Sequence, residues 1–144
     1  MMNLLLGLPT MALCLLLQSL LVLVAMRYYV NHQALVDSPS FLSSMTVINA
    51  VMLLLVVGNL AQVAIWAILF HLLGEFDQFR DAIYHSAVNF STLGYGDIVM
   101  SADHRLLGPI QAINGVLMIG VSTATLMTAF QDALKKTLRA RQQG

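Results

Sequence analysis

The chain has 144 residues, of which 58% are hydrophobic and 10% are charged, and its formal net charge is zero. Soluble domains carry roughly 25% charged residues, so this composition excludes a water-soluble globular domain and predicts a protein whose surface largely meets lipid. The balanced charge gives no indication of nucleic-acid binding. The single cysteine, Cys14, excludes a disulfide within one chain.

Three apolar stretches are long enough to cross the hydrocarbon core of a bilayer, which is roughly 30 Å thick. They cover residues 4–30, residues 45–73 and about residues 106–130. A cleaved signal peptide is the alternative for the first stretch. However, no Lys or Arg precedes its apolar part and no small-residue cleavage site is evident. We therefore predict a retained membrane helix, and an all-α membrane protein with three transmembrane helices.

The second stretch contains two amides, Asn59 and Gln62. Buried amides in a bilayer normally hydrogen-bond to a neighbouring helix, so we predict helix packing for them rather than contact with an ion. Trp66 and His71, near the end of the stretch, fit a membrane interface.

A shorter amphipathic segment follows a turn at residues 74–77. Asp77 is a plausible N-cap, and residues 79–90 then predict a helix too short to span a membrane. Its apolar face is predicted from helical spacing to comprise Phe79, Ile83, Ala87 and Phe90.

Residues 91–97 (Ser-Thr-Leu-Gly-Tyr-Gly-Asp) form a polar, glycine-bearing stretch between apolar segments. Successive carbonyls face one axis only if an extended chain alternates its handedness, and Gly94 and Gly96 permit positive φ at alternate positions. Thr92 adds a hydroxyl oxygen. Leu93 and Tyr95 are expected to point into the surrounding wall, where the Tyr95 ring can pack. Asp97 would concentrate cations at the mouth.

The segment Thr92-Leu93-Gly94-Tyr95-Gly96-Asp97 resembles the selectivity filter of tetrameric potassium channels, usually TVGYG followed by Asp. The resemblance covers about residues 45–131. It implies a pore helix at residues 79–90, a re-entrant filter loop, a homotetramer, and K⁺ coordinated by the carbonyls of Thr92, Leu93, Gly94 and Tyr95, with Gly96 completing the filter. No resident cofactor is implied, because K⁺ is the permeant ion.

The sequence departs from the family at two places. Tyr84 and His85 stand where some relatives carry paired tryptophans, which puts the bracing of the filter in doubt. Val88 stands where some relatives have a glutamate that pairs with the filter aspartate, so we expect no such pair.

The third apolar stretch contains two glycines that could bend an inner helix. The resemblance favours a gating hinge at Gly115, with Gly120 second, while close helix packing by small residues is the equal alternative. Two cavity-lining faces also remain open. Polarity selects a stripe comprising Gln111, Asn114, Met118, Ser122 and Thr125, whereas alignment with the family hinge selects Ile119 and Thr123.

Charge predicts the topology and completes a division into three parts. Residues 1–40 are an additional N-terminal transmembrane helix and loop, residues 41–131 the pore module, and residues 132–144 a basic tail. With the filter mouth external, five of seven Lys and Arg residues lie inside, in agreement with the positive-inside rule. We expect a plasma or inner membrane protein in contact with lipid, its C-terminus cytoplasmic and its N-terminus external.

Other function classes are less well supported. An enzyme is not expected, because the four histidines show no metal-ligand spacing, and the pair His71 and Glu75 is separated by Gly74 at a helix end. A weakly selective cation channel is the nearest alternative to a potassium-selective one. A non-conducting accessory membrane protein would explain the apolar stretches but not the filter motif.

Overall fold

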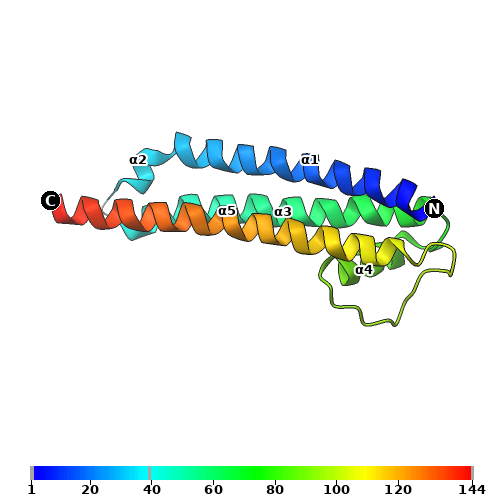
Figure 1. Cartoon of the computed structure of the whole chain (residues 1–144). Helices are drawn as coiled ribbons and strands as arrows, with labels where there is room; N and C mark the ends of the chain where they lie inside the picture. The colour runs from blue at the N-terminus through cyan, green and yellow to red at the C-terminus, as the bar shows by residue number, and fades with distance from the viewer. Residues whose placement is uncertain (1, 39, 144) are drawn as a thin grey trace. The chain divides into compact units, whose positions relative to one another are not determined.

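The computed structural model describes residues 2–38 and 40–143, and every regular element in them is helical. The helices are α1 (Met2–Asn31), α2 (Gln33–Val36), α3 (Phe41–Leu72), α4 (Phe79–Phe90) and α5 (Leu107–Gln143), shown in Figure 1. Three of them, α1, α3 and α5, are long and apolar enough to cross a membrane. The predicted fold class, an all-α membrane protein, is therefore confirmed.

Two helix ends differ from the predicted boundaries. The polar stretch between the first two spans contains the single-turn helix α2, and α3 already begins at Phe41. Helix α5 has no break at residue 131 and continues into the predicted basic tail as far as Gln143. Ala133 and Thr137, one helical turn apart, are both buried there, so packing extends the helix beyond its apolar section.

The chain divides into two compact units. Unit 1 contains Met1–Gln18 and Gly58–Ile119, and unit 2 contains Ser19–Val57 and Gly120–Gly144. Unit 1 has a core of aromatic and aliphatic residues that includes Trp66, Phe70, Phe76, Ala82 and Leu107. Trp66 is fully buried, so its ring packs against other residues of the chain, and its predicted depth at a membrane interface stays a prediction.

Within unit 1, the first half of α1 has a buried face of small and polar residues. Its members recur at helical spacing: Asn3, Gly7, Cys14 and Gln18. A Cβ atom added at Gly7 would lie 3.0 Å from Ile110 Cδ1, so a side chain there would crowd α5. Gln62 donates a 2.8 Å hydrogen bond to Gln18, which confirms the predicted amide contact between helices.

Unit 2 has a largely aliphatic core contributed by α1, α2, α3 and α5. Its buried members are Ala25, Tyr29, Val36, Val47, Ile48, Val51, Leu55, Ala129 and Ala133. A few polar contacts accompany the core. Tyr29 donates to Asp132 at 2.9 Å, and the hydroxyls of Ser44 and Thr137 lie 2.8 Å apart.

Candidate functional site

Helix α4 occupies the predicted residues, Phe79–Phe90, but its N-cap residue and its buried face differ from prediction. The N-cap is Gln78, which makes no side-chain capping bond, so the prediction of Asp77 is wrong. Phe79 is 44% exposed and Ala87 is also exposed, whereas His85 and Ser86 are buried. Polar side chains can replace apolar ones on this face because both have hydrogen-bond partners inside the unit.

Ser86 links α4 to α3 and to α5 through hydrogen bonds. Its hydroxyl donates to the Val63 carbonyl of α3 at 2.7 Å. Gln111 of α5 donates from Nε2 to Ser86 Oγ at 2.6 Å and to the Ser86 carbonyl at 3.1 Å. Ser86 and Gln111 are fully buried, and such bonds are costly to break where water cannot replace them.

At the end of α4, backbone hydrogen bonds turn the chain out of the helix. Thr92 N–H donates to the Asn89 carbonyl at 2.9 Å, and the N–H groups of Leu93 and Gly94 both approach the Val88 carbonyl, at 3.0 and 3.4 Å. The C-terminal end of α4, which carries partial negative charge, therefore adjoins the loop of residues 91–97. We call these seven residues the glycine loop.

The glycine loop alternates its backbone handedness. Its φ angles are +59° at Thr92, +60° at Gly94 and +72° at Gly96. Positive φ at the two glycines was predicted; positive φ at Thr92 was not. A non-glycine residue there costs roughly 1–2 kcal/mol, so Thr92 is held in a strained conformation. All seven residues are exposed within one chain, and Tyr95 is 67% exposed, so its ring does not pack within its own chain.

Tyr84 and His85 brace the end of the glycine loop. These are the two positions where some relatives carry paired tryptophans, so the sequence had left this bracing in doubt. Tyr84 donates its hydroxyl to Asp97 Oδ2 at 2.6 Å. This bond lowers the pKa of Asp97. His85 Nδ1 lies 2.9 Å from the Ile98 carbonyl, so it must donate, and Nε2 then accepts from Asn89 Nδ2 at 2.8 Å. Asp97 is thus hydrogen-bonded to a tyrosine, and the residue at position 88 is a valine, which has no carboxyl group to pair with it.

A comparison with protein families indicates the class of protein to which this helix and loop belong. Residues 58–132 match the model of an ion channel family, and this range is just over half of the chain. The chain belongs to this ion channel family. No curated protein and no solved structure matches it. The matched residues run from the middle of α3 through α4 and the glycine loop into α5, whereas α1 lies outside them.

Burial distinguishes the two faces proposed for α5 of this ion channel. Gln111, Asn114 and Met118 are fully buried and Ser122 is 8% exposed. These four members of the polar stripe therefore face the chain's own interior and do not line a cavity in this structure, whereas the fifth, Thr125, is half-buried. Ile119, at 41%, and Thr123 lie on the exposed side, which is the face that alignment with the family hinge selected.

The two glycines of α5 have different surroundings. A Cβ at Gly115 would lie 2.0 Å from the Phe90 carbonyl oxygen, whereas a Cβ at Gly120 would meet nothing within 4 Å. Gly115 thus lets α5 pack directly against the end of α4, and α5 is a continuous helix at both positions. Close packing is observed at Gly115; a hinge at Gly115 or Gly120 stays a prediction.

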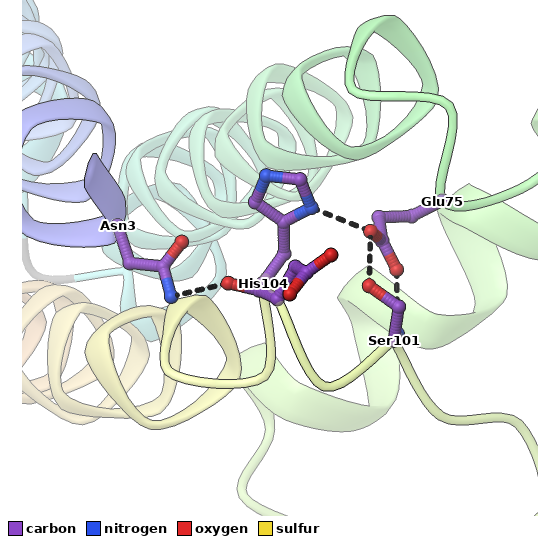
Figure 2. Close-up of polar contacts among 5 residues, drawn as sticks. Asn3, Glu75, Ser101 and His104 are labelled. Atoms are coloured by element: carbon purple, nitrogen blue, oxygen red, sulfur yellow. Dashed lines mark hydrogen bonds and ion pairs between the residues drawn. The ribbon is translucent and has the colours of Figure 1, made fainter.

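A second polar cluster of the ion channel was not predicted from its sequence. Residues 98–106, which we call the return loop, lead back from the glycine loop to α5. Glu75 accepts bonds from Ser101 N–H at 2.6 Å, Ser101 Oγ at 2.7 Å and His104 Nδ1 at 2.5 Å (Figure 2). Asn3 of α1 donates to the Asp103 carbonyl at 2.8 Å. We call Asn3, Glu75, Ser101 and His104 the clamp.

The electrostatics of the clamp favour an ionised Glu75. Its side chain is 6% exposed. Burial by itself raises the pKa of Glu75, but the hydrogen bonds from the Ser101 backbone, from His104 and from the Ser101 hydroxyl outweigh burial and hold this pKa below its usual value. His71, four residues before Glu75, contacts the Phe76 carbonyl instead, at 2.9 Å.

Proposed function

We propose that this chain is the subunit of a potassium-selective channel that conducts K⁺ passively through a filter made by the glycine loop. The carbonyls of Thr92, Leu93, Gly94 and Tyr95 would replace the hydration shell of the ion. Gly96 completes the filter, and Asp97 attracts cations to its outer mouth. The observation that carries the proposal is the alternation of positive φ at Thr92, Gly94 and Gly96 within a member of an ion channel family.

Exposure of the glycine loop supports assembly of several copies. Irregular backbone at membrane depth is tolerated only where protein surrounds it or where it lines a watery cavity. One chain leaves the whole loop exposed, including Leu93 at 54% and Tyr95 at 67%. Copies arranged in a closed ring would place the carbonyls around one axis and cover the outward side chains. The resemblance to potassium channels sets the number of copies at four.

The expected setting is a plasma or inner membrane, with the filter mouth external. The basic end of α5 would then be cytoplasmic, which agrees with the positive-inside rule. Because Asn3 contacts the return loop, the start of α1 would lie on the external side.

The test is uptake of ⁸⁶Rb⁺ into proteoliposomes containing the purified protein. A potassium-selective channel takes up Rb⁺ in competition with K⁺ but not with Na⁺, and Ba²⁺ blocks the uptake. Equal competition by Na⁺ would identify a weakly selective cation channel. No uptake from protein of verified tetrameric mass would favour an accessory role.

The variant that tests the filter assignment is Gly94→Ala. Its φ of +60° disfavours any side chain, although no atom lies within 4 Å of the added Cβ in one chain. We therefore expect the loop to lose its conducting shape while the helices and the tetramer persist. Conduction at the wild-type rate in Gly94→Ala would refute the filter assignment.

A further inference from the structure

Helix α1 carries more polar groups on its buried face than a lipid anchor requires. Outward-facing leucines are enough to hold a helix in a bilayer, and α1 has many, including Leu5 at 72% and Leu16 at 70% exposure. Its opposite face nevertheless buries Asn3 and Gln18. Buried amides in a membrane helix are stabilised by partners on neighbouring segments, so this face is built to contact specific positions in unit 1.

The contact made by Asn3 is with the loop that leaves the glycine loop. Asn3 Nδ2 donates to the Asp103 carbonyl at 2.8 Å. The next residue, His104, is held by Glu75, which lies between α3 and α4. In Figure 2, His104 is drawn between Asn3 and Glu75. Two elements far apart in the sequence therefore fix adjacent residues of the return loop.

The return loop is directly continuous with the end of the glycine loop. Ser101, the other residue held by Glu75, is four residues beyond Asp97, and the intervening Ile98 carbonyl is fixed by His85. A displacement at residues 101–104 would therefore strain the bonds at Asp97 and Ile98, because so short a segment has little slack to absorb it.

We propose that α1 is a built-in positioning helix for the filter, acting through Asn3 to complete the clamp on the return loop. This proposal rests on the proposed function. Asn3 contacts no permeant ion. It holds Asp103 while Glu75 holds Ser101 and His104, and together they maintain the outer end of the glycine loop in the shape that conducts. Loss of the Asn3 bond shifts the loop towards shapes with fewer aligned carbonyls.

The experiment compares Asn3→Leu with wild type in the full-length protein. Leucine has the same number and branching of side-chain heavy atoms as asparagine but cannot donate a hydrogen bond. We expect ⁸⁶Rb⁺ uptake to fall roughly threefold to tenfold, the range for one net hydrogen bond, with stronger competition by Na⁺. Asn3→Gln, which keeps the amide, should restore most of the uptake. The control is Leu5→Ala, an exposed position on the same turn, which should behave as wild type.

A second measurement separates positioning from general stability. Hydrogen exchange at the Ser101 amide, which is bonded to Glu75, should speed up in Asn3→Leu, while the unfolding temperature reported by Trp66 fluorescence stays close to that of wild type. Unchanged uptake and selectivity in Asn3→Leu would overturn the proposal. So would a loss of uptake matched by an equal loss of folded protein. Wild-type protein without K⁺-selective uptake would instead refute the proposed function on which this inference rests.

Discussion

The two compact units bury different kinds of side chain. Unit 1 buries the polar side chains of Gln62, His85, Ser86, Gln111 and Asn114 together with its aromatic core. Unit 2 packs mainly Val, Ile, Leu and Ala, with isolated polar contacts such as that between Ser44 and Thr137. Both contain parts of the same three long helices, so helix type does not explain the difference.

The difference follows from the kinds of chain segment that each unit contains. Unit 2 joins helices, whose backbone groups are already satisfied, and apolar contacts are sufficient for that. Unit 1 also contains the glycine and return loops, whose backbone must keep a defined, non-helical shape. Directional bonds from Ser86, His85 and Glu75 supply that definition, which non-directional apolar burial cannot do.

The largest expected effect tests the close packing of Gly115 against the end of α4. Gly115→Ala places a Cβ 2.0 Å from the Phe90 carbonyl, so α4 and α5 must separate. We expect destabilisation of about 3 kcal/mol or more, at the upper end for overpacking. The matched control Gly120→Ala, with open space around it, should be neutral or slightly stabilising. Thermal unfolding in detergent, followed by the fluorescence of the only tryptophan, Trp66, measures both.

The next prediction compares a buried hydrogen bond in each unit. Gln111→Leu removes both bonds to Ser86 and should cost about 1–3 kcal/mol of stability. Thr137→Val in unit 2 should cost at most about 1 kcal/mol, because Ser44 retains its bond to the Val36 carbonyl at 3.3 Å. Equal losses of stability in the two variants would contradict a greater dependence of unit 1 on buried hydrogen bonds.

Tyr84→Phe probes the brace at the end of the glycine loop. Without the tyrosine hydroxyl, the pKa of Asp97 should rise towards its ordinary value, because that bond is the main cause of its lowering. The acid limit of ⁸⁶Rb⁺ uptake should therefore move to higher pH in Tyr84→Phe, while uptake near neutral pH is less affected. An unchanged pH profile would show that the Tyr84–Asp97 bond does not influence the proposed filter function of the glycine loop.

The smallest effect at neutral pH is expected for the titration of Glu75. Its pKa is lowered in the fold, so its contribution to stability is fully present above the ordinary glutamate value of about 4.3 and is lost as pH falls through the lower folded value. His104 and Ser101 of the return loop contact Glu75, and His85 of α4 lies within its field. Glu75→Gln should remove this part of the pH dependence, measured by hydrogen exchange at Ser101.

Much of the site was predictable because its signals are local. The bounds of α4, though not its buried face, were predicted from the local sequence of residues 79–90, and the glycine spacing predicted positive φ at Gly94 and Gly96. The buried face of α1 was also readable in principle, because Asn3, Gly7, Cys14 and Gln18 recur at helical spacing among leucines. What that face contacts was not readable, since its partners Gln62 and Asp103 lie 44 and 100 residues away.

The sequence by itself determined the membrane class, the three long helices and the glycine loop, since hydropathy, length and glycine's freedom at positive φ act over short stretches of chain. Only the tertiary structure decided which polar groups are buried. Gln111 could be taken for a water-facing residue until Ser86 was placed beside it, and Glu75 for a surface acid until the return loop was folded over it. The physical reason is that a polar side chain can be buried wherever a partner satisfies it, and partners 25 or more residues apart meet only in the folded chain.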